Sequence, residues 1–422
     1  MSATLSPSSW SSRARWAVPV IAVVGVVGAF AGPALLAGAA ADLPPLSVEQ
    51  LVAKVADAKP GPISGTVVYT AHLGLPDLAL TKLAGASPIN LLSGSSTLRV
   101  WTDGQARSRV SLLGQASEYS VVTDATQAWT YSSTDNAVNH WTLDPADAAR
   151  LADLGKQADA GTLPGAASLP TPTAAASAAL TQAQQTSTIT LDAETTVAGR
   201  GAYQLVLTPL ATDTLVARVV VAVDAETFTP LRVQTWSTQD TKAPAVEIGF
   251  TDVSFATPSD AVLAFSAPPG ATVTEKVVNL PDKALTPEAL TPSDKPTPAP
   301  TKTSALPDGV TVHGTGWGTV LEVSGLNAAG KLADPGQAAS KLGAAGVDPS
   351  AAAGLAGKLL SQGSGSASST SGLDLGGLFQ QLTTPVNGGR LLSSALVSVL
   401  MLDDGRVLIG AVPASTLQAL AG

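Results

Sequence analysis

The sequence predicts an α+β protein that is mainly β. We expect a large curved antiparallel sheet with helices across one face, a small β-rich C-terminal domain and an N-terminal membrane helix. Short runs of alternating apolar and polar residues recur between turn residues from 63 to 266. Gly (39 residues) and Pro (30 residues) are frequent, which turns and linkers require. Residues 16–41 contain no charged side chain.

The N-terminal region is predicted to enter or cross a membrane. Residues 1–15, a predicted cytoplasmic tail, carry Arg13 and Arg15 and no acidic residue, and this basic flank favours a cytoplasmic N-terminus. Residues 16–41 are long enough to span a bilayer as a transmembrane anchor, but their small-residue end also suits a signal peptidase. A buried helix is the third alternative. Either exported form places Asp42 onward outside the membrane, attached to it or secreted after cleavage.

A first amphipathic helix is predicted to start after Ser47. Ser47 and Gln50 have the spacing of a capping box. Residues 60–62, Pro-Gly-Pro, end the helix. One apolar face with i, i+3, i+4 and i+7 spacing is supplied by Val48, Leu51, Val52 and Val55.

Two sets of strands follow, separated by helical sequence. The first set is an antiparallel meander with a hairpin signal at Asp103-Gly104, predicted at residues 63–73, 96–103, 105–113, 117–124, 127–133 and 137–143. A helix is expected at 144–158, with Asp144 as N-cap and Pro145 at its first position. The second set is predicted at residues 186–198, 201–208, 214–224, 230–237, 245–256 and 262–266. This order favours one curved sheet with helices across a face.

Composition shifts divide the chain into domains. Residues 42–275 hold the predicted sheet domain, and residues 276–308 form a linker rich in Pro and Thr. Residues 309–422 are predicted to form a small C-terminal domain with an Ala/Gly/Ser-rich insertion at 325–384. Its strands are expected at 309–323 and on both sides of Asp404-Gly405, followed by a helix from Ser415.

Composition also excludes several kinds of function. The net charge of −9 provides no basic field for phosphates, so nucleic acid is not an expected partner. The chain has no cysteine, which removes disulfides, thiolate metal sites and cysteine nucleophiles. His72, His140 and His313 are far apart in sequence and form no zinc motif. We therefore expect neither a metal, nor a cofactor, nor an enzyme.

Two short motifs have structural explanations. Glycines at 314, 316 and 318 follow His313, but no helix start comes after them, so we expect a Gly-kinked strand or a bulge rather than a phosphate loop. Asp403-Asp404 precedes Gly405 and is typical of a hairpin turn.

Aromatic residues are the remaining candidates for a binding site. Aromatics make up only 4% of the chain, and most lie in predicted strands. They serve either as ordinary core or as the lining of an apolar cavity between the sheet and its helices, large enough for an acyl chain. Strand parity places Trp129 and Tyr131 on one face. The cavity candidates are Trp101, Trp129, Tyr131 and Trp236.

A longer pattern resembles the LolA/RseB-like superfamily of lipoprotein carriers and MucB/RseB-type regulators. It consists of V-x-G-R-x-x-x-x-L-x-L-x-P followed by D-x-x-T-x-x-P-L, found here at 197–209 and 224–231. Residues 248–255, 265–270 and 64–69 are similar to other strands of this family, and 391–412 resembles the C-terminal domain of its actinobacterial members.

This resemblance implies a fold and a function. The fold would be a half-open barrel whose concave side is covered by helices. The function would be the binding of acyl chains of lipids or lipoproteins at the cell envelope. In the RseB-type branch, the partner would instead be an anti-sigma factor or another membrane protein. A retained anchor would favour sensing or local lipid handling, and a hydrolase is a remote third hypothesis.

Overall fold

Twelve strands join into one large sheet in this computed structural model, which describes residues 43–75, 85–159, 180–279, 310–324 and 382–422. The first six strands are β1 (Ile63–Ala71), β2 (Gly94–Thr102), β3 (Arg107–Leu113), β4 (Glu118–Asp124), β5 (Gln127–Ser132) and β6 (Ala137–Leu143). The other six are β7 (Ser187–Val197), β8 (Arg200–Pro209), β9 (Val216–Asp224), β10 (Pro230–Ser237), β11 (Val246–Ser254) and β12 (Thr272–Val278).

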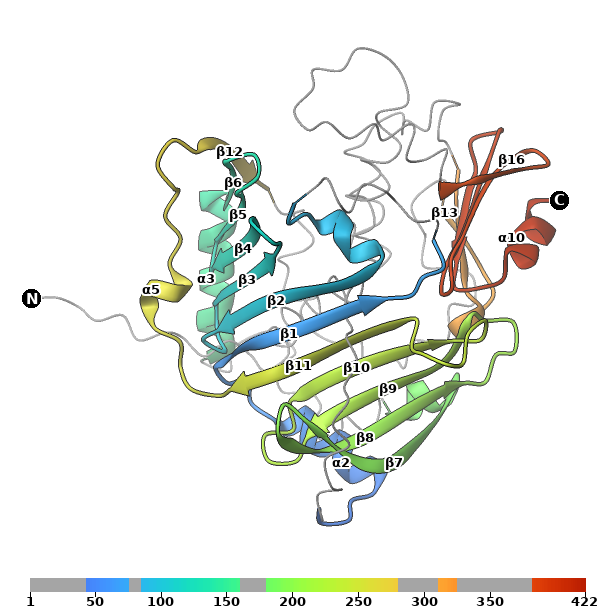
Figure 1. Ribbon diagram of the computed structural model, residues 1–422, viewed down its shortest axis with the longest axis horizontal. Coiled ribbons are helices and arrows are strands. Elements are labelled where there is room, and N and C mark those ends of the chain that lie inside the picture. The colour runs from blue at the N-terminus through green and yellow to red at the C-terminus, as the bar shows by residue number, and fades with distance from the viewer. Residues whose placement is uncertain (1–42, 76–84, 160–179, 280–309, 325–381) are drawn as a thin grey trace, which may run out of the picture.

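The sheet consists of two antiparallel meanders joined at its centre. Strands β1 to β6 follow one another outward, and β7 to β11 return so that β11 pairs with β1. The sheet order is β12-β6-β5-β4-β3-β2-β1-β11-β10-β9-β8-β7, and Figure 1 shows the strands fanning from β12 at one edge to β7 at the other. The predicted pair of strand sets in one large sheet is confirmed.

One predicted strand is wrong. Residues 262–266 do not pair with the sheet; Asp260–Leu263 instead forms the short helix α5, within the connection from β11 to β12. Leu263 is almost fully buried, and Phe265 stacks on Trp129 with a centroid distance of 5.7 Å. The short apolar run at 262–265 therefore belongs to a segment that packs onto the sheet, residues 260–265, which we call the covering segment, rather than to a strand within it.

Strand β12 was not predicted, and it is the parallel member of an otherwise antiparallel sheet. Thr272 to Val278 pair in register with Ala137 to Leu143 of β6. Every residue of β12 is exposed. The strand continues to Val278, into the range that the sequence predicts as linker. The sequence carried little signal for it, because an exposed edge strand buries no apolar face.

The predicted first helix is confirmed as α2 (Val48–Asp57). The backbone N–H of Gln50 donates to Ser47 Oγ at 3.2 Å, and Gln50 Oε1 accepts from the Ser47 N–H at 2.9 Å, so both bonds of the capping box form. The second helix, α3, spans Pro145–Asp159. Asp144 Oδ1 accepts from the Ala146 N–H at 2.8 Å, as its predicted role at the N-terminus of α3 requires.

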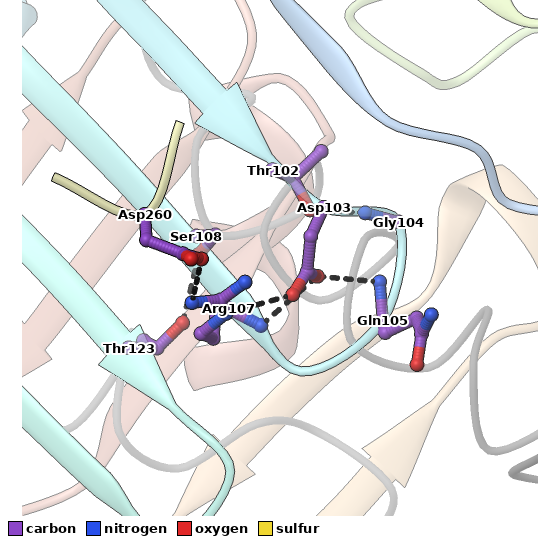
Figure 2. Close-up of polar contacts among 8 residues, drawn as sticks. All are labelled: Thr102, Asp103, Gly104, Gln105, Arg107, Ser108, Thr123 and Asp260. Carbon is purple, nitrogen blue, oxygen red and sulfur yellow. Dashed lines mark hydrogen bonds and ion pairs between the residues drawn. The ribbon is translucent and has the colours of Figure 1, made fainter. Parts of the chain in front are cut away.

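The β2–β3 hairpin fixes the start of the covering segment, as Figure 2 shows. Asp103 Oδ1 accepts from the backbone N–H of Gln105 at 2.7 Å, and its Oδ2 accepts from Arg107 Nε at 3.0 Å. Arg107 Nη1 then donates to Asp260 Oδ1 at 2.8 Å. Gly104 adopts φ +74°, and its α-carbon faces the Gly61 backbone closely enough that a side chain would collide. The predicted Asp-Gly turn thus also anchors α5.

A second sheet of six strands forms the C-terminal part. Its strands are β13 (Val310–His313), β14 (Val320–Val323), β15 (Thr384–Val386), β16 (Gly389–Ser393), β17 (Ser398–Leu402) and β18 (Val407–Gly410). Helix α10 (Ala414–Ala421) packs Leu417 into a core with Val320, Leu400 and Leu408. The turn at Asp404-Gly405 joins β17 to β18, as predicted.

The glycines near Trp317 do not kink a single strand. Gly316–Gly318 forms a short 3-10 turn, η5, between β13 and β14, so residues 310–323 make a hairpin. Positive φ at Gly314 and Gly316 permits this turn.

Several predicted segments lie outside the described residues: 16–41, the linker from 280 onward and the insertion up to 381. Among the helices that the structure does describe, none combines the length and the apolar character needed to cross a bilayer.

Direct bonds connect the two sheets. The Leu215 N–H donates to the Ala411 carbonyl at 2.7 Å, and the Ala395 N–H donates to the Leu73 carbonyl at 2.8 Å. Leu382 packs against Leu75 and Ile89 of the large-sheet unit. Figure 1 shows the small sheet at one end of the strands of the large sheet, with α10 on its outer side.

Candidate binding faces of the large sheet

The large sheet has two distinct faces, which the strand register defines. Side chains directly opposite each other on paired strands point to the same face. We call the face that contacts α2 and the 3-10 turn η2 (Pro88–Leu92) the helix-side face. It includes Tyr69 and Leu98, whose cluster contains Leu91 of η2, and Val223, which packs against Leu51 of α2. The opposite face is called the groove face.

Two rows of apolar side chains cross the helix-side face. Register places one row at Leu191, Leu205, Val221, Val233, Ile248 and Tyr69. The next row is Ile189, Leu207, Val219, Thr235, Val246 and Ala71. The apolar side chains contributed by β7 to β10 to these rows are all only half-buried. The face is therefore continuous and apolar, and it is incompletely covered over four strands.

Helix α2 covers one end of this face. Leu51 is fully buried against Tyr203 and Val223. The Tyr203 hydroxyl donates to the Pro44 carbonyl at 2.7 Å, and the Leu43 N–H donates to Glu194 Oε2 at 3.0 Å. These bonds hold the segment before the helix on β7 and β8, so α2 acts as a fixed end-wall for the apolar rows.

The groove face carries a hollow of about 470 Å³ over β7 to β10. The Arg218 guanidinium lies over the Trp236 ring at 4.3 Å from the centroid. Gln234 donates to Glu247 at 2.7 Å, and Arg232 donates to Gln204 Oε1 at 3.2 Å. The hollow, which we call the groove, is lined by side chains of this face: Thr190, Asp192, Gln204, Val206, Thr208, Arg218, Val220, Gln234 and Trp236.

All four predicted aromatic candidates lie on the groove face. Trp101, Arg109, Val122, Trp129 and His140 form one cross-strand row. Trp129 is sandwiched between His140, at 4.8 Å, and Phe265 of the covering segment. The prediction that Trp129 and Tyr131 share one face of β5 is confirmed by the strand register, in which they lie two residues apart, opposite Val122 and Ser120 of β4.

The structure separates the four candidates into two places. Tyr131 lies beside the Trp129 row, opposite Ser120, whereas Trp236 lines the groove on the other half of the sheet. None of the four is on the face that α2 covers. Their contact with an acyl chain stays a prediction. The sequence could not have shown which face of the sheet α2 covers, because both faces of these strands contain apolar residues.

A half-buried polar cluster lies beside the covering segment, to which Arg109 Nη1 donates at the Val262 carbonyl, at 3.5 Å. Glu118 Oε1 accepts from Ser111 Oγ at 2.8 Å and from Ser120 Oγ, and it pairs with Arg109 Nη2 at 3.4 Å. Burial alone would raise the pKa of Glu118, but the two serine hydroxyls and the Arg109 charge together hold it below its ordinary value. The cluster is an internal hydrogen-bonded network that keeps Glu118 ionised.

An ion pair fixes the tips of β8 and β9. Asp224, almost fully buried, accepts from Arg200 Nε at 2.5 Å and from the Thr227 N–H and hydroxyl at 2.8 Å each. Burial raises the pKa of Asp224, yet these bonds and the Arg200 charge outweigh burial, so its pKa is lowered. The residues of the family-like motif thus have a structural role in the hairpin.

The three histidines have separate surroundings. His72 contacts the Pro244 carbonyl, His140 pairs with Glu275 at 2.6 Å, and His313 pairs with Glu322 at 2.7 Å. Across the described ranges, no cluster of three or more His, Cys, Asp or Glu side chains could hold a metal ion.

Sequence reasoning missed the groove and the apolar rows. Both follow from period-two positions on β7 to β10, where Gln204, Val206 and Thr208 alternate with Leu205 and Leu207. That alternation was visible in the sequence. What was missing was the register that aligns these positions across neighbouring strands.

No protein-family model and no curated protein matches the chain. Among solved structures, it is similar to a chain of the MucA/MucB complex from Pseudomonas aeruginosa, with 15% identity over 88% of this chain and 96% of that one, and a TM-score of 0.39. It is similar to a LolA superfamily protein from Nitrosomonas europaea, with 12% identity over 52% and 99% of the two chains, and a TM-score of 0.20.

A third similarity is to a putative outer membrane lipoprotein-sorting protein domain from Vibrio parahaemolyticus, with 10% identity over 56% and 94% of the two chains, and a TM-score of 0.18. At such TM-scores and identities, nothing about this chain's ligand or partner follows from these structures.

Proposed function

We propose that the chain is an extracytoplasmic binding protein that holds an acyl chain of a lipid or lipoprotein against the helix-side face. The pair of half-buried apolar rows across β7 to β10 is the observation that carries this proposal. Covering an apolar surface with hydrocarbon is favourable by about 0.8 kcal/mol per buried methylene. An acyl chain would complete the burial that α2 begins at one end.

The dimensions of the rows suit this ligand. Neighbouring strands are about 4.8 Å apart, so the half-buried part of each row, across four strands, extends about 14 Å. That length accommodates part of an extended long acyl chain. Beneath such a row, the backbone N–H and C=O groups are already paired between the strands. An unbranched hydrocarbon has no polar group that would need a hydrogen bond from them.

A binding role is supported over catalysis by the environment of the polar groups. Glu118 and Asp224 use their oxygens in internal hydrogen bonds, and His140 and His313 each pair with a glutamate. Neither apolar row contains a nucleophile with an adjacent base. Attachment to the membrane through residues 16–41, or secretion after their cleavage, belongs to the same proposal and rests on the uncharged sequence of that segment.

A matched pair of substitutions tests the site. Val219→Asn places an amide on the helix-side face of β9, and Val206→Asn does the same on the groove face of β8. Each valine lies opposite a residue of a paired strand, and the change from Val to Asn lowers the β-propensity by the same amount at both positions. We expect Val219→Asn to weaken binding of a fluorescent fatty acid to the delipidated full chain by about tenfold, the factor that about 1.4 kcal/mol supplies.

The control variant Val206→Asn should bind within about twofold of wild type by the same titration. Equal losses in both variants, or no saturable uptake by delipidated wild type, would contradict the acyl-chain proposal. Native mass spectrometry of the purified chain should show co-purified lipid.

The regulatory role implied by the sequence resemblance is a second hypothesis. Its partner would be the extracytoplasmic part of an anti-sigma factor or another membrane protein. A pull-down from membranes with the full chain as bait should then recover one such protein in stoichiometric amount. Recovery of none would count against regulation and leave the lipid proposal unaffected.

A further inference from the structure

The groove on the opposite face has an aromatic floor with an unsatisfied donor. Among the residues that the structure describes, the Trp236 indole Nε1 is buried and has no hydrogen-bond acceptor. Buried indole N–H groups almost always find a partner, because leaving one unpaired is costly. Arg218, an exposed side chain, lies over the ring. When Arg218 swings outward, the ring face becomes available to a ligand.

Polar side chains surround this ring in fixed positions. Gln204 and Gln234 are each oriented by a bond to a neighbouring group: Gln204 donates to the Ala193 carbonyl and Gln234 to Glu247. Each amide retains a further N–H, and Gln234 retains its carbonyl oxygen. Thr190 and Thr208 add exposed hydroxyls at the rim. The groove therefore offers donors and acceptors together, held by strands, so that little ordering is needed on binding.

The charges around the groove balance. Arg218 and Arg232 are matched by Asp192 and Glu247 on the same face. A strongly anionic or cationic ligand gains little from such a surface. A peptide that binds by adding a strand would need a free sheet edge, and this groove lies on the face of the strands.

We propose that the groove over β7 to β10 is a binding site for a neutral oligosaccharide. One sugar ring would stack on the Trp236 ring, and the next sugar along the chain would accept a hydrogen bond from Nε1 in the plane of the indole. The sugar hydroxyls, which both donate and accept, would pair with Gln204, Gln234 and Thr190. The site lies on the face opposite the apolar rows and does not depend on the acyl-chain proposal.

Calorimetric titration of the full chain in phospholipid nanodiscs tests this site, with chitopentaose and maltopentaose as probes. We expect saturable binding of at least one probe. Trp236→Phe keeps an aromatic ring, smaller than the indole, and removes the N–H donor, and Gln234→Ala removes one amide. Each should weaken binding by about tenfold, which is at the upper end for the loss of one hydrogen bond. Arg99→Gln, exposed on the same face but on β2, is the matched control and should bind within about twofold of wild type.

Urea unfolding midpoints separate binding from folding. If Trp236→Phe unfolds early, the sugar affinities of Gln234→Ala and Thr190→Val test the site in its place. Absence of saturable binding for both oligosaccharides would overturn the proposal, as would equal affinities of wild type and the folded groove variants. Binding of a peptide in place of both sugars would also overturn it. Val219→Asn should leave sugar binding intact, so failure here is distinguishable from failure of the acyl-chain site.

Discussion

At the scale of single residues, Asp224 shows how the motif of the β8–β9 region stabilises the sheet. Its carboxylate, 1% exposed, accepts from five donors: Nε and Nη2 of Arg200, the Glu226 N–H, and the N–H and hydroxyl of Thr227. A buried carboxylate depends on such partners, because an unpaired charge away from water is strongly unfavourable. The Arg200 side chain reaches the carboxylate from across the strand pair and also contacts Glu226 at 2.7 Å. The network therefore couples a turn to the strand that precedes it.

Asp224→Asn should destabilise the protein by about 3 kcal/mol at pH 7, since it leaves Arg200 without its buried partner. The lowered pKa of Asp224 means that its ionised form stabilises the fold above the unfolded pKa, about 3.9, and that this contribution is lost as pH falls through the folded value. Urea unfolding at pH 7, 4 and 3 measures this. The gap between wild type and variant should shrink toward pH 3.

Asp192→Asn is the control for this prediction, because Asp192 is exposed on β7 and should change stability by less than about 0.5 kcal/mol. A gap for Asp224→Asn that stays constant down to pH 3 would show that charge is not the cause of its stabilisation.

Trp129 is the residue on which the core and cavity interpretations differ most. Because it is stacked between His140 and Phe265, we expect Trp129→Ala to lower the free energy of unfolding by about 3 kcal/mol and to leave fatty-acid binding within about twofold. Trp101→Ala, in the same cross-strand row, is the comparison. A large loss of lipid affinity with little loss of stability would instead restore Trp129 as a cavity residue.

At the scale of elements, the strands with one buried face were predictable and the exposed ones were not. The capping box of α2 and the turn at Asp103-Gly104 formed as local chemistry requires. Residues 262–266 were misassigned because a short apolar run in a covering segment cannot be distinguished from a buried strand by periodicity. The side on which Trp236 and Trp129 lie depends on long-range register, which local periodicity does not contain.

Strand β12 should be the least protected part of the large sheet. Its residues are all exposed, and its side chains are held by the Glu275–His140 pair and by Lys276 over Trp141 at 5.4 Å. Segments with few buried contacts open at low free energy. Glu275→Gln should speed amide exchange at 272–278, measured by hydrogen-exchange mass spectrometry, while β1 to β3 keep wild-type rates.

Glu226→Gln serves as the control for this exchange experiment, because Glu226 is an exposed ion-pair partner at a distant turn. Unchanged exchange at 272–278 in Glu275→Gln would mean that backbone pairing with β6 alone fixes β12.

At the scale of the whole molecule, the two sheets share buried polar contacts. The fully buried Ser237 donates through Oγ to the Ala395 carbonyl at 2.6 Å, and Trp317 Nε1 donates to Ser187 Oγ at 2.8 Å. Together with the backbone bonds from Leu215 and Ala395, these contacts tie β7, β9 and β10 to the small sheet. Separation of the two sheets would break all of these hydrogen bonds at once, and each contributes about 0.5–1.5 kcal/mol to stability.

We therefore expect both sheets to unfold in one cooperative transition. Amides of β16 to β18 should exchange at the same free energy as those of β9 and β10, because opening either sheet breaks the shared bonds. Ser237→Ala leaves the Ala395 carbonyl without this donor and should lower the free energy of unfolding of both sheets together, by about 1–2 kcal/mol. Thr251→Ala, whose exposed hydroxyl bonds Thr66 within the large sheet, is the control and should leave the small sheet unaffected. If Ser237→Ala speeds exchange in the small sheet alone, the sheets are separate folding units and the contact between them is a weak docking.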